Sequence, residues 1–148
     1  MDRYNSEKDF GNAIDVNIKP VGIIFEKLSK LGLKKFIYIS TIHVYGFSPT
    51  QNNNTSIPLD NYSLTHYLSE KICEFYSRKT DVKCFIIRLS NSYGEPVFIN
   101  ANCWDLVVNN LVKNAFIKNK IVLNSNGKSK RKFIHFLDIY DGIEKLLD

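Results

Sequence analysis

The chain has few cysteines, and they form no recognisable pattern. Its 148 residues include three, at positions 73, 84 and 103, with no Cys-x-x-Cys pair and no His/Cys cluster at the spacing of a metal site. An odd number of cysteines without a secretory signal predicts reduced thiols in the cytoplasm. We therefore expect neither a disulfide framework nor a metal centre.

Long apolar runs are also missing. No uninterrupted run reaches the ~18 residues that a membrane-spanning helix needs. The first residues, MDRYNSEKD, are polar and mixed in charge, unlike a signal peptide. The sequence predicts a soluble, cytoplasmic protein with no membrane contact.

Charge is moderate and dispersed. The net charge is +5, with a pI near 9.0, and the only dense basic run covers residues 128–132. Such a run is most often a solvated turn and less often a phosphate site. Neither an aromatic platform nor a helix-turn-helix pattern accompanies it, so we expect no nucleic-acid partner.

The patterns that are present alternate between helix and strand. Hydrophobic residues make up 44% of the chain, and its length suffices for one domain with a core. Helices are predicted over 16–31, 62–78, 103–118 and 139–147, and strands over 36–39, 82–89, 121–123 and 133–136. Residues 1–12 are predicted to be a loose lead-in, and 47–61 a loop. The second helix carries an apolar stripe at Leu64, Leu68, Ile72 and Phe75. This alternation, without an internal repeat, predicts parallel βαβ units.

Two segments carry the chemistry. Residues 36–46 read FIYISTIHVYG, and residues 61–71 read NYSLTHYLSEK. A short apolar strand thus ends in two hydroxyls, and a later helix opens with tyrosines that have basic residues four positions on. A hydroxyl, a phenol and a base gathered at a strand end suit proton transfer to or from a substrate oxygen.

Five motifs in order resemble those of the extended short-chain dehydrogenase/reductases, the NAD-dependent epimerase/dehydratase family that acts on sugar nucleotides. That family has an Asn-bearing helix, a Ser-Ser/Thr-x-x-Val-Tyr-Gly strand end, a Tyr-x-x-x-Lys helix, an Arg-x-x-Asn-x-Tyr-Gly strand end and an Arg-Asp-Phe-Ile-His-x-x-Asp segment. The corresponding positions here are Asn17, 40–46, 62–71, 88–94 and 131–138. The resemblance spans roughly residues 15 to 148.

The resemblance implies an α/β fold: part of a Rossmann-like parallel sheet with helices on both faces, and the start of a C-terminal substrate-binding region. Residues 1–95 would form the Rossmann-like portion, and 96–148 the substrate-binding region packed on it as a single structural unit. The family's dimers further imply a homodimer through helices 18–31 and 62–78.

One departure from the family is a missing glycine-rich turn. The family begins with a strand, a Gly-x-x-Gly-x-x-Gly turn and a helix that receives the dinucleotide pyrophosphate. The seven glycines here offer no such spacing. The chain therefore resembles the central and C-terminal part of such an enzyme without its first βαβαβ unit.

The second departure concerns the tyrosine and its basic partner, for which two registers compete. Tyr67 and Lys71 satisfy Tyr-x-x-x-Lys literally, whereas Tyr62 and His66 fit the surrounding motif positions better. The two tyrosines lie roughly 140° apart around a helix, so both pairs cannot face one site. We favour Tyr62 and His66.

The resemblance also implies roles for individual residues. The tyrosine would exchange a proton with the sugar while hydride passes to or from the nicotinamide, and the basic residue would hold the nicotinamide ribose. The predicted catalytic residues are Thr41, Tyr62 and His66, with Tyr67 and Lys71 as the alternative. The predicted cofactor residues are Asn17, Ser40, Tyr62 and His66, and the predicted residues for the substrate diphosphate are Asn91 and Arg131.

Two hypotheses of function follow. The first is an NAD(P)-dependent sugar-nucleotide epimerase, dehydratase or reductase, or its C-terminal part. The second is a non-catalytic remnant that binds a nucleotide-diphosphate sugar or a partner chain through the same surface. Because a neutral imidazole lowers a nearby phenol pKa less than an ammonium does, the His66 register predicts a higher pH optimum or weaker catalysis.

Overall fold

The computed structural model describes residues 1–46, 56–98, 100–101, 103–123, 126–128 and 130–148. It divides into two compact units, Met1–Leu89 and Ser90–Asp148. Most of the predicted loop 47–61, and Ser129 of the basic run, lie outside the described residues. The domain boundary at residue 95 and the packing of the second region on the first remain predictions.

The first unit opens with two short helices, α1 (Arg3–Lys8) and α2 (Phe10–Ala13), so the prediction of a loose lead-in was wrong. An aspartate caps each helix: Asp2 Oδ1 accepts from the Asn5 backbone N–H at 2.9 Å, and Asp9 Oδ1 from that of Asn12 at 2.9 Å. Such caps stabilise helices that have no apolar stripe. A composition-based prediction therefore misses them.

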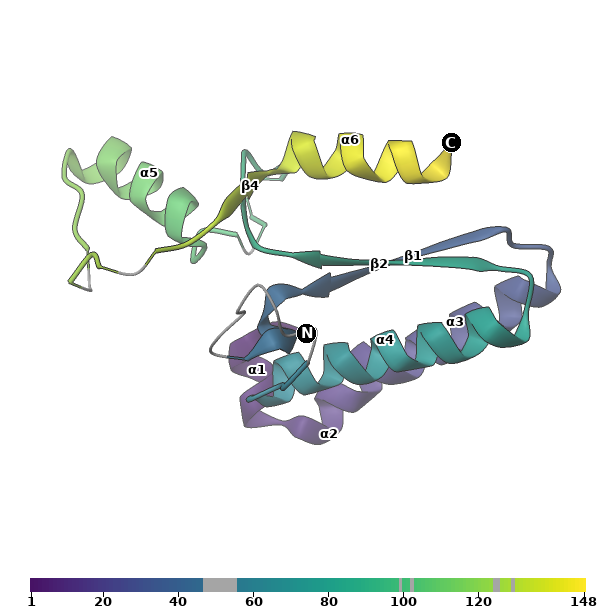
Figure 1. Cartoon of the computed structure of the whole chain (residues 1–148). Coiled ribbons are helices and arrows are strands. Elements are labelled where there is room, and N and C mark those ends of the chain that lie inside the picture. The colour runs from purple at the N-terminus through teal and green to yellow at the C-terminus, as the bar shows by residue number, and fades with distance from the viewer. Residues whose placement is uncertain (47–55, 99, 102, 124–125, 129) are drawn as a thin grey trace. The chain divides into compact units, whose positions relative to one another are not determined.

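The remaining elements of this unit follow the predicted order. They are the π-helix η1 (Ile14–Ile18), α3 (Lys19–Lys30), β1 (Lys35–Thr41), the 3-10 helix η2 (Ile42–Tyr45), α4 (Asn61–Lys79) and β2 (Lys83–Leu89). Strands β1 and β2 pair in parallel, from Lys35 opposite Lys83 to Thr41 opposite Leu89. Helices α3 and α4 run side by side beneath this sheet (Figure 1).

The core of the first unit lies between the helices and the near face of the sheet. Phe25, Cys73 and Val82 are its buried members, and the rings of Phe25 and Phe36 lie 4.6 Å apart. Burying a phenylalanine completely stabilises a fold by about 1.5–3 kcal/mol. On the far face of the sheet, Ile39 is 39% exposed.

Helix α4 buries a different face from the one that its apolar stripe predicted. Its buried residues are Ser63, Thr65, Ser69, Glu70 and Cys73, whereas Leu68 and Phe75 are 38% and 50% exposed. The buried polar groups are hydrogen-bonded, which removes the cost of desolvating them.

The second unit contains β3 (Asn91–Tyr93), α5 (Val107–Lys118), β4 (Phe133–His135) and α6 (Phe136–Leu147). Strands β3 and β4 pair in parallel, with Ser92 opposite Ile134. The predicted strand 121–123 was wrong, because these residues are irregular and more than half exposed. A β-strand needs a neighbour for its backbone groups, and among the described strands none pairs with this segment.

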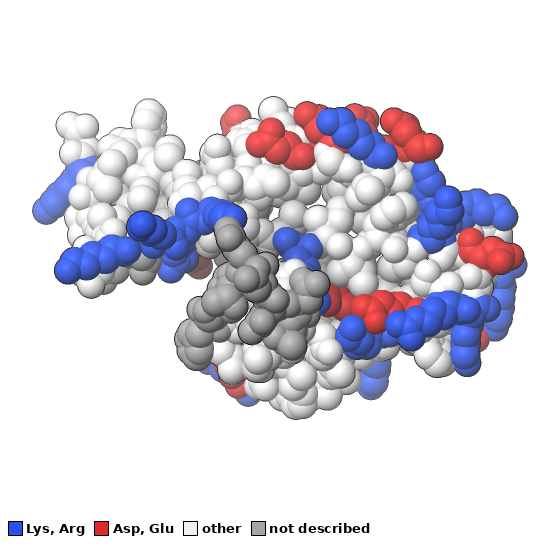
Figure 2. Space-filling model, in the orientation of Figure 1, with Lys and Arg blue, Asp and Glu red and all other residues white. Residues whose placement is uncertain are grey.

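Basic side chains gather at the end of the first unit where α3 and α4 finish (Figure 2). Lys27 and Lys30 lie in the last turn of α3, and Arg78 and Lys79 in that of α4. Cations are favourable at helix C-termini, which gives this charge a structural role. Among the described helices, none is both long and apolar enough to cross a membrane.

Candidate active site

The C-terminal end of β1 presents two buried hydroxyls, Ser40 and Thr41. Thr41 ends the strand and caps η2, because its Oγ1 accepts from the backbone N–H of His43 at 3.3 Å. The chain then turns at Gly46, where φ is 73° and ψ is −150°. An added Cβ there would lie 2.7 Å from the carbonyl oxygen of Ile57, so the turn requires glycine.

Helix α4 brings Tyr62 to these hydroxyls. Asp60 and Ser63 form a capping box, in which Asp60 Oδ1 accepts from the Ser63 backbone N–H at 2.7 Å. The cap fixes the first turn of the helix, which carries Tyr62. Burial raises the pKa of the Tyr62 phenol, and a hydrogen bond from the Thr41 side chain acts in the opposite direction. The phenol is therefore protonated at neutral pH.

His66 lies one turn further along α4, against the ring of Tyr62. The two ring centroids are 4.5 Å apart in an edge-to-face arrangement. His66 Nδ1 lies 3.0 Å from the hydroxyl of Tyr38 on β1. Burial lowers the pKa of His66 to about 4, so the imidazole is neutral at physiological pH.

The alternative pair, Tyr67 and Lys71, has different surroundings. The Lys71 ammonium lies 5.2 Å from the centre of the Tyr67 ring and 3.0 Å from both carboxylate oxygens of Glu74. The Lys71 side chain is 46% exposed. The structure thus gathers Thr41, Tyr62 and His66 together, while the charge of Lys71 is paired with a neighbour on the same helix.

Asn17 anchors the N-terminal helices to α4. It lies in the π-helix η1, and its backbone oxygen accepts from Ser69 Oγ at 2.9 Å. Its amide Nδ2 donates to Thr65 Oγ1 at 3.0 Å, and its Oδ1 accepts from the amino group of Met1 at 2.6 Å. The π-helix η1 therefore places the buried side-chain amide of Asn17 against Thr65, the residue that precedes His66.

A buried ion pair that the predicted site did not include lies behind the hydroxyls. Glu70 Oε1 accepts from Ser40 Oγ at 2.5 Å and from Arg88 Nε at 2.9 Å, and Glu70 Oε2 accepts from Arg88 Nη2 at 2.6 Å. The guanidinium also covers the Tyr45 ring, with its carbon 4.5 Å from the ring centre. Arg88 begins the motif at 88–94, and Glu70 lies in the 61–71 segment, so the sequence did hold a sign of this pair.

The two residues predicted to contact the substrate diphosphate meet in the second unit. Arg131 Nη1 lies 3.4 Å from Asn91 Oδ1, and Asn91 Nδ2 donates to the Lys132 backbone oxygen at 3.1 Å. Parallel pairing of β3 and β4 brings these distant parts of the sequence together. Arg131 is exposed and available to an anion.

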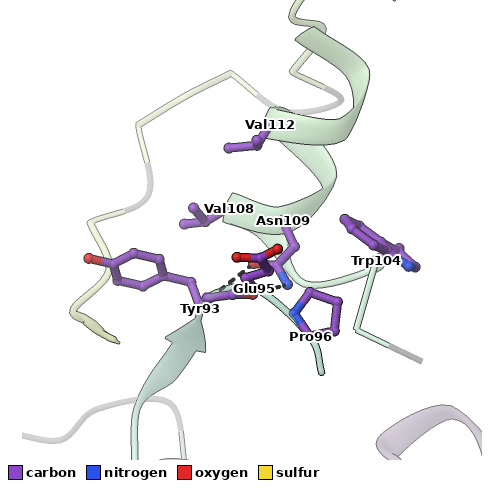
Figure 3. Close-up of a pocket in the computed structure, with 8 residues that line it drawn as sticks. Tyr93, Glu95, Pro96, Trp104, Val108, Asn109 and Val112 are labelled. Atoms are coloured by element: carbon purple, nitrogen blue, oxygen red, sulfur yellow. Dashed lines mark hydrogen bonds between the residues drawn. The ribbon is translucent and has the colours of Figure 1, made fainter. Parts of the chain in front are cut away.

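The second unit also has an apolar cavity of about 370 Å³ next to the end of β3 (Figure 3). Asn109, which sequence analysis missed, lines this cavity together with Gly94, to which it makes two hydrogen bonds. Its Oδ1 accepts from the Gly94 N–H at 3.3 Å, and its Nδ2 donates to the Gly94 oxygen at 3.1 Å. The other lining residues are Tyr93, Glu95, Pro96, Trp104, Val108 and Val112.

The sequence of this chain is similar to one protein family and to individual known proteins. The NAD dependent epimerase/dehydratase family matches residues 4–148. The uncharacterized UDP-glucose epimerase YtcB of Bacillus subtilis (strain 168) is 26% identical over 136 residues, which cover 88% of this chain and 40% of that protein. The dTDP-D-glucose 4,6-dehydratase of Dictyostelium discoideum is 27% identical, covering 97% of this chain and 35% of that protein.

Solved structures agree in fold. The UDP-glucuronic acid 4-epimerase from Bacillus cereus, in complex with UDP-glucuronic acid and NAD, superposes with a TM-score of 0.83 at 26% identity. The superposition covers 99% of this chain and 46% of that structure. The chain thus spans less than half the length of these relatives.

Proposed function

Because this chain belongs to the NAD dependent epimerase/dehydratase family, we propose that it carries the acid–base site of an NAD(P)-dependent enzyme acting on sugar nucleotides, an epimerase, dehydratase or reductase. The observation that carries the proposal is the meeting of Thr41 and Tyr62, from a strand end and a helix start, with His66 against the same phenol. This arrangement favours Tyr62 and His66 over Tyr67 and Lys71 as the working pair.

In this proposal Tyr62 exchanges a proton with the reacting hydroxyl or carbonyl oxygen of the sugar. Thr41 Oγ1 hydrogen-bonds the same substrate oxygen and thereby orients it toward the phenol. Positioned proton transfer of this kind contributes about 100- to 10,000-fold to a rate. The raised pKa of Tyr62 keeps the phenol protonated in the unliganded protein, and only the phenolate can take up a proton, so we expect faster proton abstraction at alkaline pH.

The residues present fit the nicotinamide end of the cofactor. His66 offers a ring nitrogen to a ribose hydroxyl, and Ser40 Oγ keeps its lone pairs after donating to Glu70. Asn17 keeps a second amide hydrogen beside Thr65. When bound, the nicotinamide supplies or takes up the hydride of the reaction. The glycine turn that holds the pyrophosphate in the family has no counterpart in this sequence.

The proposed substrate is a nucleotide-diphosphate sugar. Arg131 and Asn91 offer a guanidinium and an amide, which suit the diphosphate oxygens. The cavity beside Trp104 and Val108 has the apolar lining and the volume of a small-molecule site. Among the compared proteins, the B. cereus epimerase was solved with UDP-glucuronic acid and NAD.

We further propose that the chain pairs with a second copy through α3 and α4. Both helices expose apolar side chains: Ile23, Ile24, Leu28 and Leu31 at α3, and Leu68 and Phe75 on α4. Leu31 is 81% exposed. Removing apolar surface from water is favourable by roughly 25 cal/mol per Å², and this gain opposes the entropic cost of association.

The experiment is a binding titration of the purified chain. NADH is followed by fluorescence, and UDP-glucose and dTDP-glucose by calorimetry, with His66→Ala and Arg131→Ala as variants. We expect saturable binding of both ligands, weaker NADH binding for His66→Ala and weaker nucleotide-sugar binding for Arg131→Ala. Binding of neither ligand would contradict a working site in this chain. Binding of the nucleotide-sugar alone would favour the non-catalytic alternative.

A further inference from the structure

Tyr38 contacts His66 although it lies outside the five segments that resemble the family's motifs. It lies on β1, two residues before Ser40, and faces α4 with the core residues of the first unit. Its hydroxyl lies 3.0 Å from His66 Nδ1, within hydrogen-bond distance. Its ring centroid lies 6.0 Å from that of His66.

The direction of this hydrogen bond decides the chemistry of His66. A neutral imidazole has one N–H donor and one acceptor nitrogen, and the bond at one nitrogen determines the role of the other. If the phenol donates to Nδ1, then Nε2 carries the ring proton and is a donor. If Nδ1–H donates to the phenol oxygen, Nε2 is an acceptor.

The neighbours of Tyr38 favour the phenol as the donor. Burial raises the pKa of Tyr38 to about 12, so the phenol keeps its proton. Besides His66, the Ser69 hydroxyl contacts the phenol, and the proton of Ser69 is directed at the backbone oxygens of Asn17 and Thr65, each 2.9 Å away. The phenol proton therefore has two acceptors, Ser69 Oγ and His66 Nδ1, and the imidazole nitrogen is much the stronger base.

We infer that Tyr38 is a positioning residue that holds His66 in the Nε2–H form, as a neutral hydrogen-bond donor. Since the phenol occupies Nδ1, Nε2 is the ring nitrogen left for a ligand. His66 then offers one fixed N–H where a lysine at this position would offer a charged ammonium with three donors. The functional importance of this donor rests on the proposed function, since a ribose hydroxyl would be its acceptor, whereas the tautomer itself does not.

The test is nuclear magnetic resonance of the histidine ring nitrogens in the ligand-free chain at neutral pH. Long-range correlations between ring protons and ¹⁵N nuclei distinguish a protonated from an unprotonated ring nitrogen. The chain has three histidines, so loss of one pattern in His66→Gln assigns the signal. We expect a protonated Nε2 and an unprotonated Nδ1 in the wild-type protein.

The Tyr38→Phe variant then removes only the hydroxyl. We expect the His66 pattern to become an average of the two tautomers, while Tyr76→Phe leaves it unchanged. Tyr76 is a suitable control because it is also a half-buried tyrosine packed on Phe25, with ring centroids 5.6 Å apart. Circular dichroism and thermal unfolding show whether each variant is folded.

Three results would overturn the inference. A protonated Nδ1 in the wild-type protein does so without any variant, and therefore applies even if Tyr38→Phe fails to fold. An unchanged His66 pattern in a folded Tyr38→Phe variant would also overturn the inference. An averaged pattern in the wild-type protein would overturn it too. Absence of NADH binding with the expected tautomer present would instead count against the proposed function.

Discussion

The Arg88 guanidinium donates a hydrogen bond to each carboxylate oxygen of Glu70, with Nε 2.9 Å from Oε1 and Nη2 2.6 Å from Oε2. Glu70 is fully buried, and it also accepts from Ser40 Oγ. This pair connects the middle of α4 to the ends of β1 and β2. It therefore sets where Tyr62 on α4 lies relative to Thr41 on β1.

We predict that Glu70→Ala destabilises the fold strongly, because it leaves the guanidinium of Arg88 without its partner in a largely buried position. Breaking a buried pair by removing one side costs about 3–5 kcal/mol. Glu74→Ala is the matched control on the same helix, since its pairs with Lys71 and Arg78 are exposed. We expect about 0–1 kcal/mol there. Urea unfolding of both variants measures the difference, and equal losses would contradict the assignment.

Gly46→Ala is predicted to destabilise the turn after η2. The backbone conformation there costs a non-glycine residue about 1–3 kcal/mol. The new Cβ would in addition meet the Ile57 carbonyl oxygen at 2.7 Å. Gly142→Ala in α6 is the control, because a Cβ there meets nothing within 4 Å and alanine favours a helix. Thermal unfolding should show a lower Tm for Gly46→Ala alone.

The pKa of His66 predicts how stability depends on pH. It is lowered by burial from 6.5 to about 4, so between these values the unfolded chain binds a proton that the folded chain does not. The free energy of unfolding should therefore decrease as pH falls from 6.5 to about 4, and this loss should be complete below pH 4. His66→Gln removes the contribution. Denaturation series of both proteins should show a smaller slope for the variant, and identical slopes would refute the assignment.

Oligomeric state tests the proposed pairing through α3 and α4. Ile24→Glu and Phe75→Glu place a charge on each helix, so we expect the dimer to dissociate because charges are costly at an apolar interface. Phe116→Glu is the control: its side chain is 91% exposed but lies on α5. Light scattering coupled to size exclusion gives the mass. A monomeric wild-type chain, or dissociation by the control alone, would exclude this interface.

The sequence predicted most elements, but not which face of α4 is buried. Periodicity located that helix well, since propensity and the Asp60 cap act locally. Its apolar stripe failed as a guide to burial because Ser69 and Glu70 have buried partners on η1, β1 and β2, which are distant in the chain. The contact between Tyr38 and His66 was missed for the same reason. Nothing in a single sequence states which strand residue faces a given turn of a helix.

The proposed site is tested most directly by comparing Tyr62→Phe with Tyr67→Phe in a single-turnover assay. The chain is mixed with NAD⁺ and either UDP-glucose or dTDP-glucose, and formation of NADH is followed by absorbance. We predict that Tyr62→Phe slows the reaction about 100- to 10,000-fold, because it removes the group that transfers the proton. Tyr67→Phe should react at the wild-type rate. A slow Tyr67→Phe together with an unaffected Tyr62→Phe would contradict the proposed site.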